Sequence, residues 1–196
     1  MTTKRVLLVL KIVTAVALTL TLGIVLFRMA YRVCLEAIYP VKYEEYVTAY
    51  AEEYGLEPSL VYAVIHAESR FKPDAESSAG AKGLMQLMDA TDEWVRTSVL
   101  GEDAPPEQIY EPEVNIRCGC KVLQIVLGQF ENTETALAAY NAGSGNVSNW
   151  LKNSEYSDDG VTLKYIPVTE TRNYVTRVLR AQKMYQSLYD VDKEDA

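Results

Sequence analysis

One apolar helix that ends in a single carboxylate constrains this chain more than any other stretch. The segment Pro58 to Glu68 reads PSLVYAVIHAE, and proline suits the first turn of a helix. Three apolar residues share the helical face of that glutamate, seven, four and three positions before it: Val61, Val64 and Ile65. Such a face packs inward, where a carboxyl group is poorly solvated and its protonated form is favoured. A carboxyl that stays protonated near neutral pH is what a general acid requires.

The sequence after this helix predicts a loop. Phe71 and Lys72 lead into Pro73, and the residue before a proline is disfavoured in the helical region. Glu68 therefore lies at a helix end, beside a loop. An isolated glutamate in such a place is most often a surface turn residue, so the residues around it must decide between the two interpretations.

Those surrounding residues form short motifs in a fixed order. The motifs are Glu68-Ser69, Gly83-Leu84-Met85-Gln86, Asn115-Ile116 and Ala139-Tyr140-Asn141-Ala142-Gly143. In this order and at these separations they make the chain similar to the lytic transglycosylase family. More narrowly, it resembles the catalytic domain of the soluble-lytic-transglycosylase type, a goose-lysozyme relative, over roughly residues 45 to 188. The resemblance implies cleavage of the glycan strands of peptidoglycan.

The remaining pattern is helical, with no strong strand pattern and no internal repeat. Apolar periodicity and capping residues predict helices over about 43–54, 58–68, 111–130, 134–141 and 170–189, and a helix or helical turn from 83 to 88. We therefore expect an all-α fold. The resemblance implies that it is a lysozyme-like catalytic domain preceded by a single transmembrane helix.

The transmembrane prediction comes from an apolar run near the N-terminus. Leu7 to Phe27 is 21 residues long, which as a helix reaches about 31 Å, close to one hydrocarbon core. A cleaved signal peptide is the alternative, but no small-x-small cleavage site follows the run. We predict an uncleaved anchor over residues 1–30, a tether over 31–42, the lytic transglycosylase domain over 43–189 and an acidic tail over 190–196.

Charge and composition limit the partners of the domain beyond the anchor. Residues 40–196 hold 14 Lys and Arg against 26 Asp and Glu, so this part should repel nucleic acid and anionic lipid surfaces. One histidine, no CxxC pair and no paired His-Glu spacing give no metal site, and we expect no cofactor. His66 is interpreted as structural. Cys118 and Cys120 point away from each other on a helix, so a disulfide between them is not expected.

Only one carboxylate fits the chemistry, although glycoside hydrolysis usually needs two. Asp74 and Glu76 follow Glu68 closely but lie in a polar loop. The resemblance implies a substrate that supplies its own nucleophile. Glu68 would protonate the bond between N-acetylmuramic acid and N-acetylglucosamine, then deprotonate the muramyl C6 hydroxyl, which closes a 1,6-anhydro ring.

The resemblance also implies substrate-binding roles for six other residues. Ser77 would hold the muramyl acetamido group, and Gln86 and Met88 would line the groove. The Tyr140 hydroxyl would reach the Glu68 carboxyl or the substrate. These six positions are Ser77, Gln86, Met88, Tyr140, Asn141 and Glu170.

Each of these residues also has a plainer interpretation. Ser77 fits an ordinary loop hydroxyl, Tyr140 a core aromatic, and Glu170 a first-turn helix acid. Asp89 stands where the family usually has proline, and Val122 where an aromatic often occurs, so the shape of the groove stays open.

Three functional alternatives stay open as well. A hydrolytic muramidase would let water attack, and a non-catalytic glycan-binding module of an envelope secretion or conjugation machine would not cleave at all. A surface polysaccharide other than peptidoglycan is the third. The charges that flank the apolar run differ little, so the peptidoglycan substrate decides the topology: a single-pass protein of the cell membrane with its catalytic domain on the extracytoplasmic side.

Overall fold

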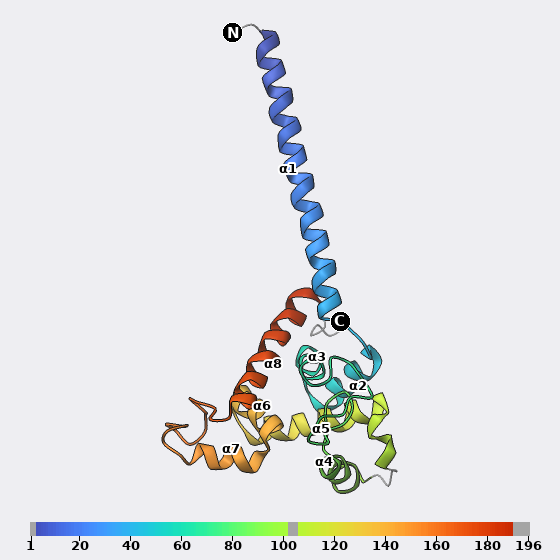
Figure 1. Ribbon diagram of the computed structural model, residues 1–196, viewed down its shortest axis with the longest axis vertical. Coiled ribbons are helices and arrows are strands. Elements are labelled where there is room, and N and C mark those ends of the chain that lie inside the picture. The colour runs from blue at the N-terminus through green and yellow to red at the C-terminus, as the bar shows by residue number, and fades with distance from the viewer. Residues whose placement is uncertain (1–2, 102–105, 190–196) are drawn as a thin grey trace. The chain divides into compact units, whose positions relative to one another are not determined.

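The computed structural model describes residues 3–101 and 106–189, so the predicted acidic tail over 190–196 lies outside the described residues (Figure 1). Contacts along the chain divide it into two units, Met1–Pro40 and Val41–Ala196.

The first unit is one helix, α1, over Thr3–Ile38. Its stretch Leu10–Ile38 is long and apolar enough to cross a membrane, with a mean hydropathy of 2.3 and none of it buried. Three threonine hydroxyls within it, at positions 14, 19 and 21, donate to main-chain carbonyls three or four residues earlier. Hydroxyls satisfied in this way do not oppose insertion into an apolar medium. The helix also continues through most of the predicted tether.

The second unit is built from helices, and the predicted all-α fold is confirmed. Its elements are α2 (Glu44–Tyr54), α3 (Pro58–Glu68), α4 (Asp89–Glu93), a π-helix (Trp94–Val99), a 3-10 helix (Pro106–Tyr110), α5 (Pro112–Gln129), α6 (Thr133–Ala142), α7 (Ser144–Leu151) and α8 (Thr169–Leu188). Within the described part of the chain, β-structure is limited to two isolated bridges, Glu76 with Lys82 and Lys82 with Leu87. The segment 83–86 between the bridges is a turn rather than a helix.

The centre of this unit is α3, which is buried on all sides from Ser59 to Ile65. It packs against α8 and α2 (Figure 1). The rings of Tyr62 on α3 and Tyr185 on α8 stack at a centroid distance of 5.3 Å. Because α3 is apolar around its whole circumference, it can only be stable as a helix enclosed by others.

Helix α5 supports the turn over residues 83–86 through one close packing contact. A Cβ added at Gly119 would lie 2.3 Å from the sulfur and 2.7 Å from the Cβ of Met85, so only glycine lets this buried methionine sit against the helix. Glycine is otherwise unfavourable inside a helix. The close approach explains why α5 retains it.

We predict that Gly119→Ala destabilises the protein by about 1–3 kcal/mol, because the added methyl overpacks the contact with Met85. Urea unfolding of the full chain in detergent, followed by near-ultraviolet circular dichroism, measures the loss.

Gly128→Ala is the matched control, because Gly128 lies in the same helix with no atom within 4 Å of an added Cβ. It should leave stability unchanged or raise it by up to about 1 kcal/mol. Equal stability of the two variants would contradict the packing of Met85 on α5.

Candidate active site

Glu68 is the last residue of α3, and the chain turns sharply after it. The Ser69 N–H donates to the Ile65 carbonyl at 3.0 Å, and the Ser69 hydroxyl donates to the same oxygen at 3.2 Å. Arg70 and Phe71 then both take left-handed backbone angles, with φ of 51° and 61°. Such angles are costly for residues other than glycine, and the burial of the Phe71 side chain offsets the cost. The turn therefore fixes the end of α3, and Glu68 with it.

The Glu68 carboxyl is half-buried, and its surroundings favour the protonated form. Desolvation raises its pKa from the usual 4.5 to about 7, while the Tyr174 hydroxyl and the charge of Arg177 act in the opposite direction. Desolvation has the largest effect, because the carboxylate loses more hydration free energy on burial than its interactions with Tyr174 and Arg177 restore. The carboxyl is thus still partly protonated near neutral pH.

Two buried tyrosine hydroxyls flank the acid, one from α6 and one from α8. Tyr140 donates to the Met85 carbonyl at 2.9 Å, which ties α6 to the turn at residues 83–86. The Tyr174 hydroxyl makes no hydrogen bond of good geometry among the described residues, although it is close enough to Glu68 to favour the carboxylate. Burial and the charge of Glu68 together hold the pKa of both tyrosines well above the ordinary value.

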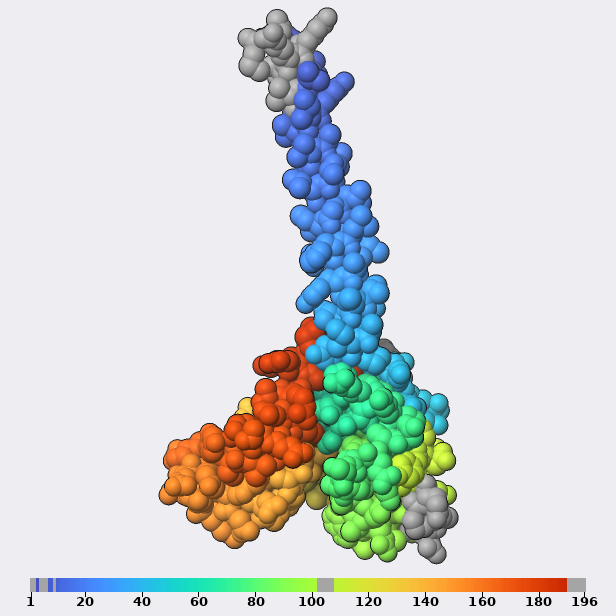
Figure 2. All heavy atoms as spheres, in the orientation of Figure 1, coloured from blue at the N-terminus to red at the C-terminus, as the bar shows by residue number. Residues whose placement is uncertain are grey.

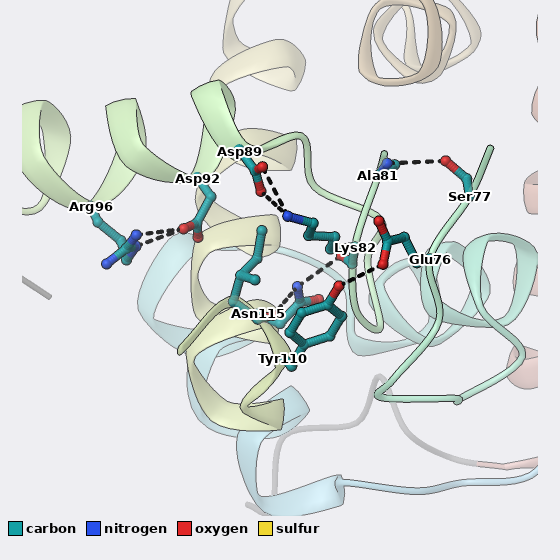
Figure 3. A network of polar contacts seen from close by, with 10 residues as sticks. Glu76, Ser77, Ala81, Lys82, Asp89, Asp92, Arg96, Tyr110 and Asn115 are labelled. Carbon is teal, nitrogen blue, oxygen red and sulfur yellow. Dashed lines mark hydrogen bonds and ion pairs between the residues drawn. The ribbon is translucent and has the colours of Figure 1, made fainter. Parts of the chain in front are cut away.

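The turn beside the acid is clamped from below by one buried amide, Asn115 on α5. Its Oδ1 accepts from the Met85 N–H at 2.7 Å, and its Nδ2 donates to the carbonyls of Lys82 at 3.1 Å and Ile109 at 2.8 Å. Figure 3 shows Asn115 between Lys82 and Tyr110. A Cβ on Gly83 would lie 2.3 Å from the Asn115 Nδ2, so the clamp requires glycine there. The Asn115-Ile116 and Gly83-Leu84-Met85-Gln86 motifs thus form one structural unit.

Ser77 and Gln86 lie on the loop that this clamp holds. The Ser77 hydroxyl accepts from the Ala81 N–H at 3.0 Å, so its own proton is left to donate elsewhere (Figure 3). Gln86 has a left-handed φ of 51°, and its Nε2 donates to the carbonyls of Ala75 at 3.1 Å and Gly83 at 2.9 Å. Both N–H groups of the amide hold the loop, which leaves its oxygen for a ligand.

The outer edge of the loop carries charged groups that are already partnered. Lys82 pairs with Asp89 at 2.8 Å, and the Tyr110 hydroxyl donates to Glu76 at 3.0 Å (Figure 3). Behind them a buried ion pair joins Arg96 to Asp92 at 2.7 Å. Glu76 therefore has a structural partner away from Glu68. Asp89, which departs from the family pattern, holds Lys82.

Three of the predicted site residues are exposed. Met88 is 44% exposed just before α4, Asn141 lies near the end of α6, and Glu170 lies in the first turn of α8. Asn141 and Glu170 make no hydrogen bond or ion pair among the described residues. Tyr140 connects two of the predicted positions, because it interacts with the charge of Glu68 and its hydroxyl bonds the turn that carries Gln86.

Two residues near the acid were not identified from sequence. The pattern of α8 places Tyr174 among its apolar positions, and the ring is indeed buried against α3, but the hydroxyl faces the carboxyl. The Arg177 guanidinium lies 6.0 Å from the Tyr174 ring centroid. The sequence contains one signal for this pair: Tyr174 and Arg177 are three residues apart, so they are neighbours on one face of the helix.

The surface of the second unit is hollowed on one face. Figure 2 shows the hollow between the orange and red surface of α7 and α8 and the green surface of residues 70–100.

Among the described residues, no group of three His, Cys, Asp or Glu side chains could hold a metal ion. His66 packs edge-on to the Tyr185 ring, with a centroid distance of 6.4 Å.

Comparison with known proteins identifies the family. The family model described as "Transglycosylase SLT domain" matches residues 45–161. The soluble lytic murein transglycosylase of Salmonella typhimurium is 39% identical over 155 residues, which are 78% of this chain and 24% of that protein. The membrane-bound lytic murein transglycosylase C of Serratia proteamaculans is 32% identical over 168 residues, 74% of this chain and 47% of that protein.

The fold has solved counterparts as well. An inactive mutant of lytic transglycosylase Slt from Pseudomonas aeruginosa superposes with a TM-score of 0.70 at 36% identity, over 81% of this chain and 26% of that one. This chain spans about a quarter of the length of the soluble relatives and about half that of the membrane-bound ones. The fold is therefore the predicted lysozyme-like one, and the chain belongs to the family of the transglycosylase SLT domain.

Proposed function

We propose that this protein is a peptidoglycan lytic transglycosylase in which Glu68 is the one catalytic carboxylate. The observation that carries the proposal is a half-buried carboxyl, with its pKa raised to about 7, beside two tyrosine hydroxyls at the end of α3. Membership of the family and relatives named lytic murein transglycosylases support the substrate. A group that is partly protonated and partly ionised near neutral pH suits both donation and removal of a proton.

The reaction needs Glu68 twice. Its O–H protonates the glycosidic oxygen, the bond from that oxygen to C1 of N-acetylmuramic acid breaks, and N-acetylglucosamine leaves with a free 4-hydroxyl. The acetamido carbonyl of the same sugar stabilises the positive charge at C1. The Glu68 carboxylate then takes the proton of the C6 hydroxyl, whose oxygen bonds to C1. The 1,6-anhydro ring closes without water, and Glu68 regains its proton.

The surrounding side chains would bind and orient the sugar next to the bond. Ser77 has a hydroxyl proton to donate to the acetamido carbonyl, and Gln86 has an unused amide oxygen for a sugar hydroxyl. Met88 offers an exposed apolar surface to a sugar ring, and we extend the proposal to Asn141 and Glu170 as more distant contacts. Tyr140 orients the turn at residues 83–86 through its bond to Met85.

We further propose that α1 anchors the protein in the cell membrane, with the catalytic domain on the extracytoplasmic side, where peptidoglycan lies. The apolar stretch Leu10–Ile38 of α1 and relatives named membrane-bound support the anchor. We retain 1–30 as the anchor, 31–42 as the tether and 43–189 as the catalytic domain. The division of the chain into two units after Pro40 supports these boundaries. Work within a cell-envelope machine is compatible with this topology.

We predict that Glu68→Gln lowers cleavage of purified peptidoglycan by at least about 100-fold, because the amide cannot donate the proton. Release of soluble fragments from labelled walls measures the rate. Asp74→Asn is the matched control, since Asp74 is an exposed acid of the adjacent loop, and it should stay within about twofold of the wild type.

The same substitution should stabilise the fold above neutral pH. Because the folded pKa of Glu68 lies above the unfolded value, ionisation costs stability as pH rises from about 4.5 to about 7. Glu68→Gln removes that cost, on the order of 1–3 kcal/mol at pH 8, and gives no gain near pH 4. Wall cleavage by a stable Glu68→Gln variant at the wild-type rate would instead indicate a non-catalytic glycan-binding module.

The pH profile provides a separate prediction. Since Glu68 must be protonated to act as the acid, kcat/KM should be level below pH 7 and fall as pH rises above it. Tyr174→Phe removes a group that favours the carboxylate, so the falling limb should move to a pH about 0.5–1 higher. Tyr46→Phe on α2 serves as control. A limb that moves to lower pH would contradict the assigned role of Tyr174.

The mass of the product shows whether C1 is attacked by the C6 hydroxyl or by water. We expect muramyl ends lighter by one water than those a muramidase releases, because ring closure excludes water from the product. Mass spectrometry of fragments from the full chain in detergent measures this. Reducing muramyl ends as the main product would show that the protein is a hydrolase. If the walls stay intact and another polysaccharide is cleaved, that polysaccharide and not peptidoglycan is the substrate.

A further inference from the structure

A groove of about 660 Å³ runs along one face of α8. Its floor is apolar, from Val175 and Leu179 on the helix and Ile166 in the segment before it. Four of its lining residues are cationic and one is acidic. Tyr174 is buried on the opposite face of α8, so the groove is separate from the candidate active site.

Two of the four cations are committed to the fold. Lys164 pairs with Asp158, and Arg172 donates to the Ile166 carbonyl at 2.7 Å. The other two, Arg180 and Lys183, are exposed and make no ion pair or hydrogen bond among the described residues. These two can pair with carboxylates without breaking an existing contact.

The segment that follows α8 has the complementary charge. Past Tyr189 the sequence continues as DVDKEDA, residues 190–196, with four acids and one lysine. The last turn of α8 carries no base. Lys183 and Arg180 are therefore the first cations that this acidic segment meets if it returns along the helix.

The segment is long enough to return that far. Tyr189 lies six residues after Lys183 and nine after Arg180, which is about 9 and 13.5 Å along α8. Seven extended residues span about 23 Å. A chain that folds back after Tyr189 is level with Lys183 at about Asp192, and with Arg180 one or two residues later. Because alternate residues of an extended chain point to the same side, Asp192 and Glu194 can face the two cations together.

The covalent connection makes weak contacts sufficient. Exposed ion pairs are individually weak. A connection of a few residues, however, holds the two partners at an effective concentration on the order of millimolar. An occupant of the groove also covers apolar side chains that otherwise face water.

We propose that residues 190–196 fold back into this groove, where Asp192 pairs with Lys183 and Glu194 pairs with Arg180. The segment then covers the apolar floor and clamps the last turns of α8. Those turns carry Tyr185, whose ring stacks on Tyr62 of α3. The clamp thus supports the packing around the central helix of the domain.

A charge-reversal cycle on the full chain in detergent tests the two ion pairs. Hydrogen exchange of residues 180–188 is measured in a tail variant, Asp192→Lys/Glu194→Lys, in a groove variant, Arg180→Glu/Lys183→Glu, and in their combination. The tail and groove variants should each exchange about two- to tenfold faster than the wild type, because like charges then meet. The combined variant should return to the wild-type rate, because opposite charges meet again.

The control is Glu52→Lys/Glu155→Lys, which makes the same change in charge at exposed carboxylates outside the groove. It should leave the exchange of residues 180–188 at the wild-type rate. Without docking, the lysines of the tail variant would slow exchange, because cations stabilise the C-terminal end of a helix. Slower exchange in the tail variant, or a combined variant that is not restored, would overturn the proposal.

Cross-linking shows whether the segment occupies the groove of its own chain. Thr176→Cys/Ala196→Cys and Gln186→Cys/Ala196→Cys are compared as full chains in detergent under mild oxidation, both with the exposed Cys34 replaced by serine. All the pairing charges remain. A docked segment holds Ala196 near Thr176, which lines the groove, and about 15 Å along the helix from Gln186.

The link to position 176 should therefore form at least about fivefold faster than the link to position 186. A segment outside the groove would link faster to position 186, which is nearer in the sequence, and that result would overturn the proposal. Links between two chains would assign the groove to a second copy and also overturn it.

Discussion

Desolvation of the Glu68 carboxyl is the constraint on which the rest of the domain depends. A carboxyl becomes a useful acid near neutral pH only where water is largely excluded, and the whole circumference of α3 serves that exclusion. An apolar helix of this kind must be enclosed, by α8 on one side and α2 on another. The strained turn at Arg70 and Phe71 then stops the helix at the acid. Fold and chemistry are set by the same burial.

A second support comes from main-chain groups that a loop cannot satisfy by itself. The turn over residues 83–86 would leave buried N–H and C=O groups unpaired, at a cost of about 1–3 kcal/mol each. Asn115 pairs the Met85 N–H of this turn and the Lys82 carbonyl just before it, and Tyr140 pairs the Met85 carbonyl. Gly83 and Gly119 make room for this arrangement. These bonds satisfy buried polar groups of the turn, although the described residues contain only isolated bridges and no regular strand.

The sequence predicted the parts of this architecture that depend on local patterns. The period of apolar residues located α3, α5 and α8, and the neighbours of Glu68 indicated a buried acid. It did not identify Tyr174, because a tyrosine on an apolar face looks the same whether its hydroxyl faces solvent or a carboxyl 106 positions away. Nor did it predict the left-handed backbone at Gln86, which depends on the clamp by Asn115. Both features arise from contacts between distant segments.

The two tyrosines beside the acid differ in what they can offer it. A phenol has one proton, and Tyr140 commits its proton to the Met85 carbonyl, so toward Glu68 its oxygen can only accept. Tyr174 has made no such commitment and can donate. Tyr174 lowers the pKa of Glu68, whereas burial raises it. The protonated and ionised forms of Glu68 are therefore close in free energy near neutral pH, as the proposed transfer of a proton in both directions within one turnover would require.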